Sequence, residues 1–314
     1  MRALITGISG FVGGHLNGHL LGLGWQVFGF DKRAPGDEPN VLTGDMKDHD
    51  ALRSAFQASR PDVVFHLAGL IKSDQPEAVY QANVIGTVNL FECVMELEQR
   101  PVVLMASSSA VYGPGFGGRP ITENFKPRPM THYAVSKLAQ EMVALRYFAA
   151  SGIPVMIVRM FNLLGPGQPP DLACSAFALQ IALTETLGGN EIVTGDLGAR
   201  RDFVDVRDAV RAFALAAEKG KPGQIYNVCS GHAVLMRKCL DEMLSMSTRQ
   251  FRIRMDAGKI QKNDVPVQVG NAGKLNKATG WHPQIRRKQS IFDLLNYWRL
   301  KVKSELELQN GLEK

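Results

Sequence analysis

The sequence predicts an α/β fold in which helices cover both faces of a parallel sheet. Short apolar runs alternate with helical patterns along the first half of the chain, which is the order of elements in doubly wound sheets. The runs are continuous rather than alternating in polarity, as expected for parallel strands buried on both faces. Of the 314 residues, 45% are hydrophobic, so the chain is long enough to bury a large core.

The first predicted element is a strand that runs into a glycine turn. Ala3–Ile5 is apolar, and Gly7, Gly10 and Gly13 follow Thr6. Gly7 permits a tight turn, Gly10 lets the backbone approach a pyrophosphate, and Gly13 lets the next helix pack closely on the strand. That helix presents its positive end to the phosphate. The glycine spacing differs from G-x-G-x-x-G, but its place between a strand and a helix predicts a Rossmann-type dinucleotide site.

The second predicted strand, Val27–Phe30, ends in an acid about twenty residues after the turn. Here Asp31 can accept a hydrogen bond from the ribose 2′-hydroxyl of NAD, whereas Lys32 and Arg33 can meet the 2′-phosphate of NADP. The sequence therefore favours NADH and leaves NADPH open.

Three further strands, Val63–His66, Val102–Ser107 and Val155–Met160, continue the predicted sheet. After Asn162 the pattern changes to a loop, a helix near Ala176–Leu187, and short strands around Ile192 and at Ile225–Val228. We predict a dinucleotide-binding domain of residues 1–160 plus about 204–228, a smaller discontinuous C-terminal substrate-binding lobe of 161–203 plus 229–300, and a tail of 301–314. Such a lobe covers the carboxyl ends of the strands, where open α/β sheets bind ligands.

The net charge of +6 does not indicate a nucleic-acid partner. Basic residues are scattered, and the densest run, Arg286–Lys288, has no aromatic residue among its charges, so stacking platforms are missing. We interpret this run as a solvated face that helps to attract an anionic substrate.

The cysteines and histidines do not predict a metal site. His15 and His19 stand four residues apart without a third ligand nearby, and the four cysteines lack paired spacing: Cys93, Cys174, Cys229 and Cys239. No apolar stretch reaches membrane-spanning length, and no secretory segment precedes the first strand. We expect reduced thiols, no metal, no membrane association and a cytoplasmic location.

Tyr133 and Lys137 carry the predicted chemistry. Four residues apart on a helix, they share one face, so the ammonium can lie beneath the phenol. Shifting the tyrosine pKa from ~10 to about 7 needs roughly 4 kcal/mol, which the lysine and a cationic nicotinamide can supply. Tyr297 also has a lysine four residues on, but it lies in a late amphipathic helix without a preceding buried strand. We therefore predict that Tyr133 is catalytic and that Tyr297 packs.

Several segments stand in the order of one family's motifs: Thr6–Gly13, Phe65–Ala68, Asn83–Thr87, Ser108–Gly113, Tyr133 with Lys137, Arg159–Asn162, Gly165–Gln168 and Gly195–Asp208. In them, nearly the whole chain resembles the extended short-chain dehydrogenases/reductases that act on nucleotide-activated sugars. Met160 departs from the family pattern, which has proline there.

Within the family, the resemblance is nearest to the reductases of GDP-4-keto-6-deoxy-mannose, which make GDP-rhamnose or a close relative. It implies NAD(P)H-dependent reduction of the sugar C4 ketone in deoxysugar and polysaccharide biosynthesis. Members that dehydrate sugars need a carboxylate beside the active-site hydroxyl, where this chain has Ser109 and Ala110. An NAD-dependent epimerase similar to UDP-glucose 4-epimerase, and a non-catalytic dinucleotide sensor, stay open as alternatives.

The resemblance implies that Tyr133 protonates the carbonyl oxygen, Lys137 holds the nicotinamide ribose and Ser108 polarises the carbonyl. Ser108 as a turn hydroxyl, Asn162 as a loop cap and Arg201 as a surface ion pair are the structural alternatives. Where relatives carry an arginine and a proline before Asp264–Pro266, this chain has Gln261 and Lys262. The candidate substrate contacts are Ser108, Ser109, Asn162, Arg201 and Lys262. The candidate cofactor contacts are Gly7, Gly10, Phe11, Val12, Gly13, Asp31, Lys32, Arg33, Asp45, Met46, Leu67, Ala68, Tyr133 and Lys137.

The resemblance also implies a homodimer built on two helices from each subunit, Asn83–Leu97 and the helix of Tyr133. Both carry more apolar residues than one buried stripe requires: Val84, Val88, Leu90, Phe91, Val94 and Met95 on one, and Leu138, Met142, Val143, Leu145 and Phe148 on the other. The alternative is that the sheet and neighbouring loops of the same subunit cover both apolar faces of these helices.

Overall fold

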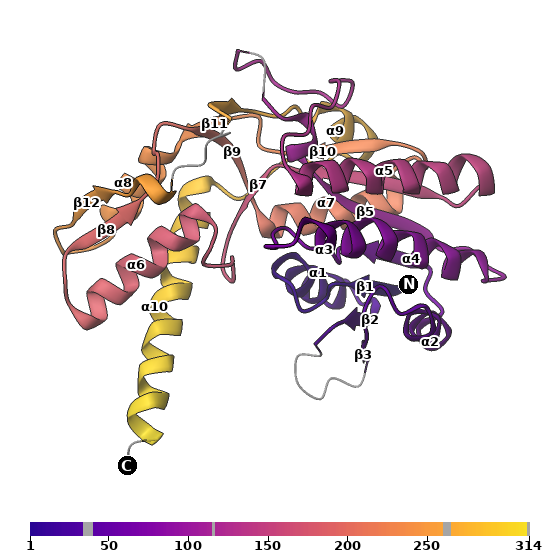
Figure 1. Ribbon diagram of the computed structural model, residues 1–314, viewed down its shortest axis with the longest axis horizontal. Helices are drawn as coiled ribbons and strands as arrows, with labels where there is room; N and C mark the ends of the chain where they lie inside the picture. The colour runs from indigo at the N-terminus through magenta and orange to yellow at the C-terminus, as the bar shows by residue number, and fades with distance from the viewer. Residues whose placement is uncertain (34–39, 115–116, 260–264, 313–314) are drawn as a thin grey trace.

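A computed structural model describes residues 1–33, 40–114, 117–259 and 265–312 of the chain. Its centre is a seven-stranded sheet in the order β10-β6-β5-β4-β1-β2-β3 (Figure 1). All neighbouring strands pair in parallel. The strands are β1 (Arg2–Thr6), β2 (Gln26–Asp31), β3 (Val41–Thr43), β4 (Val63–His66), β5 (Val102–Ser108), β6 (Val155–Met160) and β10 (Ile225–Val228). The predicted doubly wound fold is confirmed.

The strand order reverses its direction between β1 and β4, so these neighbours flank the switch point of the sheet. Thr6 pairs with His66 at their carboxyl ends. Open α/β sheets bind ligands at this place, because the connections on either side lead to opposite faces of the sheet and leave a crevice. The fold therefore puts the glycine turn after β1 at the mouth of that crevice.

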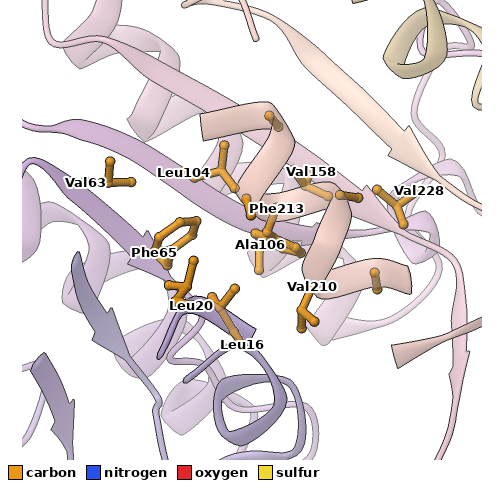
Figure 2. Close-up of a cluster of buried hydrophobic side chains, with 14 of the residues drawn as sticks. Leu16, Leu20, Val63, Phe65, Leu104, Ala106, Val158, Val210, Phe213 and Val228 are labelled. Carbon is orange, nitrogen blue, oxygen red and sulfur yellow. The ribbon is translucent and has the colours of Figure 1, made fainter. Parts of the chain in front are cut away.

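Helices cover both faces of the sheet, and each face has its own apolar core. Leu16 and Leu20 of α1 (Phe11–Gly22), together with Phe213 of α7 (Val206–Lys219), pack on the side chains of one face (Figure 2). The other face is covered by α2 (His49–Ser59), α4 (Gly86–Met95) and α5 (His132–Ser151). The short α3 (Pro76–Tyr80) and a π-helical turn, η1 (Gln81–Ile85), precede α4. Burial of both faces explains why the strands are continuously apolar.

A smaller lobe lies beside the carboxyl ends of the large sheet (Figure 1). Its apolar core lies among the helices α6 (Ala173–Leu187), α8 (Met236–Leu244) and α10 (Arg287–Leu312), where Trp298 donates a hydrogen bond to Oγ of Ser175 at 2.8 Å. The lobe comprises β7 (Asn162–Leu164), α6 (Ala173–Leu187), β8 (Glu191–Thr194), β9 (Arg200–Asp205), β11 (Ala233–Leu235), α8 (Met236–Leu244), β12 (Arg252–Met255), β13 (Val267–Gln268) and α10 (Arg287–Leu312). In it, β7, β11 and β13 pair with β9, and β12 pairs with β8.

Two segments lie elsewhere than the predicted domain division places them. The helix α9 (Gly273–Thr279) packs against α7 and β10, and Trp281 donates to the main-chain oxygen of Asp208 at 2.9 Å. Both therefore belong to the core of the large sheet, although the sequence assigns residues 229–300 to the lobe. The helix α10 continues through residues 301–312, where the sequence predicts a tail.

Candidate active site

The turn between β1 and α1 has the backbone geometry that a dinucleotide requires. Gly7 has φ +76°, in the left-handed region that favours glycine, and its N–H donates to the main-chain oxygen of Phe30 at 2.8 Å. A Cβ on Gly13 would lie 2.1 Å from the oxygen of Gly7, so only glycine permits this contact of helix and strand. Gly10 caps α1, and a Cβ there would meet only the oxygen of Gly7, at 3.2 Å. The open side of Gly10 and the first N–H groups of α1 fit a pyrophosphate.

Asp31 is already oriented by the turn. Its carboxylate accepts hydrogen bonds from the backbone N–H of Ser9 at 3.0 Å and of Lys32 at 2.7 Å. Arg33 is exposed, and its main-chain oxygen accepts from the hydroxyl of Ser9 at 2.7 Å. The acid and the base predicted to discriminate NAD from NADP thus flank the same end of the turn.

Lys32 is directed away from that acid. Its ammonium lies 3.1 Å from a carboxylate oxygen of Asp45. Partial burial opposes ionisation of Asp45, but hydrogen bonds from the Lys47 backbone and Lys32 leave its pKa below the usual value. Met46 is buried beside Gly86. Of the predicted contacts, Asp45 is therefore placed to hold Lys32, and Met46 packs under the site.

A hollow of about 430 Å³ opens beside the glycine turn. Its walls include Phe11 and His15 of α1, Pro166 of the loop after β7, and Tyr297 of α10. Nε2 of His15 lies 2.8 Å from the main-chain oxygen of Pro166, which joins α1 to that loop. The sequence interpretation of Tyr297 as a packing residue missed that α10 reaches the turn, because only the tertiary fold brings them together.

Tyr133 and Ser108 meet at the carboxyl end of β5. Ser108 is the last residue of this strand, and its Oγ accepts from the backbone N–H of Ala110 at 3.1 Å. Burial raises the pKa of Tyr133 above its usual value, and a hydrogen bond with Ser108 offsets part of the rise. The lowered pKa expected from the sequence depends on a bound cationic nicotinamide as well as on the lysine, and in the chain alone burial outweighs the hydrogen bond with Ser108. The raised pKa suits a proton donor, because the phenol keeps its proton at neutral pH.

Lys137 lies one helical turn after Tyr133 and is 5% exposed. Its ammonium donates to the main-chain oxygen of Ala106 at 3.1 Å and to Oε1 of Gln140 at 2.9 Å. Burial lowers the pKa of Lys137 to about 8, although Glu141 acts in the opposite direction. The sequence identifies the lysine but not Gln140, which lies three residues on and so on the same helix face.

A buried ion pair fixes α5 on the sheet behind the candidate catalytic side chains. Glu141 binds Arg159 of β6 through contacts of 2.8 and 2.6 Å and accepts from Ser107 of β5 at 2.5 Å. The guanidinium also lies 4.7 Å from the ring centre of Tyr112. Removing one partner of such a pair leaves an uncompensated buried charge, so the pair sets the position of α5 firmly.

The candidate substrate contacts lie at the border of the two lobes. Oγ of Ser109 donates to Gln268 of β13 at 3.1 Å, so this hydroxyl has a partner within the protein. Asn162 on β7 faces Phe203 on β9, and Arg201, two residues before Phe203, lies on the same face of that sheet. Arg201 donates to the main-chain oxygen of Val265 at 2.5 Å. Lys262 lies outside the described residues.

Other candidate ligand types find no support in the described part of the chain. No group of three or more histidine, cysteine or acidic side chains able to hold a metal occurs among these residues. None of the described helices has the length and apolar character needed to cross a membrane. The four cysteines are buried and free.

A nucleotide-binding turn at a sheet switch point, with a serine, tyrosine and lysine beside it, defines a dinucleotide-dependent oxidoreductase of Rossmann fold. Comparison with known proteins agrees, since the model of the NAD dependent epimerase/dehydratase family matches residues 3–229. GDP-6-deoxy-D-mannose reductase of Pseudomonas aeruginosa is 32% identical over 312 residues, covering 97% of this chain and 99% of the relative. The chain therefore belongs to the NAD dependent epimerase/dehydratase family, whose members are NAD(P)-dependent nucleotide-sugar enzymes.

Two solved structures have closely similar folds. RMD from Pseudomonas aeruginosa, complexed with NADPH, has a TM-score of 0.86 at 31% identity and covers 96% of this chain and 100% of that one. UDP-glucose 4-epimerase from Thermus thermophilus, in complex with NAD, has a TM-score of 0.85 at 28% identity, with 95% and 99% covered. The predicted family and the NAD(P) cofactor are thus confirmed.

Proposed function

We propose that the protein reduces the C4 ketone of a GDP-linked 4-keto-6-deoxy sugar. The proposal rests on the environment of Ser108, where the partly buried Tyr133 lies beside the serine and no carboxylate stands at positions 109 and 110. Glu141, also near this site, is engaged by Arg159 and Ser107. Positions 109 and 110 thus offer no base to remove a proton next to the ketone, whereas Tyr133 can donate a proton to its oxygen. The likeness to GDP-6-deoxy-D-mannose reductase supports the GDP-linked substrate.

The reaction assigns one task to each side chain. When bound, a reduced nicotinamide supplies the hydride. Ser108 orients and polarises the carbonyl oxygen, and Tyr133 gives that oxygen a proton as negative charge develops on it. Lys137 holds the nicotinamide ribose and stabilises the phenolate that Tyr133 becomes. Gly10 and the start of α1 hold the pyrophosphate.

Asn162 and Arg201 are our candidates for the substrate diphosphate. Their strands β7 and β9 are paired, and both residues lie on the same face of the lobe sheet. A planar guanidinium matches phosphate oxygens well. We further propose that Ser109 supports this region through Gln268 rather than by direct contact with the sugar, and that Lys262 adds positive charge.

An epimerase is the second candidate, because the same serine, tyrosine and lysine would serve it and a UDP-glucose 4-epimerase has a similar fold. The test is to mix the purified protein with reduced cofactor and the product of a GDP-mannose dehydratase. We expect stoichiometric loss of nicotinamide absorbance, and no loss with GDP-mannose or UDP-glucose. Interconversion of UDP-sugars without net loss of cofactor would instead select the epimerase.

Cofactor choice follows from Asp31 and Arg33. The preoriented acid favours NADH, and the exposed guanidinium beside it allows NADPH to bind. Arg33→Ala should weaken NADPH much more than NADH, while Asp31→Asn should weaken NADH more. Equal effects of each variant on both cofactors would contradict this assignment.

We also propose a cytoplasmic homodimer. The four buried free thiols support a reducing compartment. On α4 and α5, Met95 is 36% exposed, Val135 39% and Met142 50%, which leaves apolar side chains on the outer face of the helix pair. Part of the apolar surplus counted in the sequence is absorbed within the subunit, because Leu90, Phe91 and Val94 are buried in its core.

A further inference from the structure

Lys137 is the end of a chain of buried hydrogen bonds that crosses four elements. Oε1 of Gln140 accepts from its ammonium at 2.9 Å, and Nε2 of Gln140 donates to Oγ1 of Thr87 at 2.7 Å. Oγ1 of Thr87 lies 2.8 Å from Nε2 of His66, and Nδ1 of His66 lies 2.8 Å from Oγ1 of Thr6. Lys137 is 5% exposed and the other four residues 0%. The chain thus links α5 through α4 to the carboxyl ends of β4 and β1.

The hydrogens of this chain fix the orientation of the Gln140 side chain. An ammonium only donates, so Gln140 must turn its oxygen toward Lys137 and its NH₂ group toward Thr87 and His66. Oγ1 of Thr87 donates to the main-chain oxygen of Asn83 at 2.6 Å, which leaves it as an acceptor for Gln140. The reverse orientation of the amide would set NH₂ against the ammonium and leave Thr87 opposite an acceptor.

The His66 ring in this chain is neutral. Either neutral tautomer pairs its two nitrogens, because Nε2 lies near both Thr87 and the Gln140 NH₂ group, the latter at 3.1 Å. An imidazolium could still donate to Thr87 and Thr6, but it would place a positive charge in a buried site near Lys137. Burial and the lysine charge lower the pKa of His66 to about 3, so the ring is neutral at physiological pH.

We propose that Gln140 is a positioning residue that directs the Lys137 ammonium toward the cofactor ribose and the Tyr133 hydroxyl, and that Thr87 and neutral His66 hold its amide in place. The proposal rests on the roles of Tyr133 and Lys137 in the proposed function. The oxygens of Ala106 and Gln140 take two of the three ammonium hydrogens. These two bonds fix the nitrogen, so the third hydrogen has a set direction instead of rotating freely.

Within the described part of the chain, few charged groups influence the pKa of Lys137. The titratable groups that interact with it are His66 on β4 and Glu141 on α5, with Arg159 on β6 bound to Glu141, and with Tyr133 one helical turn before Lys137 on α5. His66 is neutral and Glu141 is fixed by two partners. A change at Gln140 therefore acts directly on the protonation and direction of Lys137.

The test compares Gln140→Leu with the nearly isosteric Gln140→Glu, and with Ala144→Gly as a control one turn farther along the same buried face of α5. The first readout is the titration of Lys137 in the cofactor-free protein, followed by NMR of ¹³Cε-labelled lysine. We expect Gln140→Leu to lower the midpoint by about one pH unit or more and Gln140→Glu to raise it, since one removes an acceptor and the other adds a negative charge. Ala144→Gly should leave it unchanged.

The second readout is the pH dependence of turnover. At neutral pH, Gln140→Leu should lower kcat about 10- to 100-fold with little change in KM for the sugar nucleotide, and Gln140→Glu should recover part of it. The pH at which turnover falls on the alkaline side should be lower in Gln140→Leu and higher in Gln140→Glu than in the wild type. A Lys137 midpoint unmoved by both variants would overturn the proposal, as would a kcat loss equal to that of Ala144→Gly. Failure of the wild type to oxidise cofactor would reject the proposed function alone, because the titration needs neither cofactor nor substrate.

Discussion

At the scale of single residues, the site combines a tyrosine that burial keeps protonated with a lysine that burial makes less basic. The first shift suits a reductase, in which the phenol starts with its proton, and the second still leaves Lys137 protonated at neutral pH, as the proposed mechanism requires. The pair could be predicted from the sequence because its spacing is local and a serine-rich strand end precedes it. The hydrogen bonds beyond Gln140 could not, since Thr87 and His66 meet its side chain only after β4, α4 and α5 have packed.

Tyr133→Phe should reduce turnover by at least ~100-fold, because it removes the donor of the proton. Cofactor binding and the fold should be largely kept. Tyr147→Phe is the matched control, since it removes a hydroxyl from the same helix. That hydroxyl donates to Glu92. Steady-state kinetics with the keto sugar and a fluorescence titration of reduced cofactor measure both effects. Near-normal turnover of Tyr133→Phe would exclude this residue from the mechanism.

Turnover should fall as pH rises through about 8, where Lys137 loses its proton in the folded protein. The lowered pKa affects stability with the opposite sign. Between about 8 and the ordinary value of 10.5, the unfolded lysine binds more protons than the folded one, so its contribution to the free energy of unfolding rises with pH. Turnover and urea unfolding measured from pH 7 to 10 separate the two effects. Constant turnover over that range would contradict a role for the ammonium.

At the scale of elements, the strands of the large sheet could be predicted because burial on both faces makes them continuously apolar. In the lobe, the strand predicted around Ile192 is present as β8, but β9 could not be found in this way. In β9, Arg200 and Arg201 precede a buried Asp202 that accepts hydrogen bonds from the backbone N–H groups of Ser230, Gly231 and Gly270. This strand is held to the neighbouring loops by the buried Asp202 carboxylate and not by a stripe of apolar side chains. No short-range sequence pattern predicts such a strand.

The turn from β1 to α1 separates two roles of glycine. Gly10→Val should leave the fold intact and abolish cofactor binding, because φ is −75° at Gly10 and its added side chain would fill the phosphate space. Gly13→Ala should lower the free energy of unfolding by about 1–3 kcal/mol or more, since its Cβ would collide with Gly7. Urea unfolding and cofactor titration of both variants provide the test. Unchanged nicotinamide affinity in Gly10→Val would refute the placement of the pyrophosphate.

At the scale of the whole molecule, the two lobes are joined by more than the chain crossings between them. The helix α10 packs in the core of the small lobe and also brings Tyr297 to the hollow beside the glycine turn. The loop after β7 is tied to α1 through His15 and Pro166. Residues of the lobe therefore lie directly beside the glycine turn, and the sequence pattern does not indicate this contact.

The proposed dimer makes the last prediction. A twofold interface on α4 and α5 would bring each outer face against its own copy, so a charge introduced there would meet itself across the axis. Met142→Glu should therefore convert a species of twice the 34.4 kDa chain mass into the monomer. Leu300→Glu is the control, because Leu300 is 71% exposed on α10, which extends away from α4 and α5 (Figure 1). Sedimentation at micromolar concentration measures the mass, and a wild type that sediments as a single 34.4 kDa species would rule out the dimer.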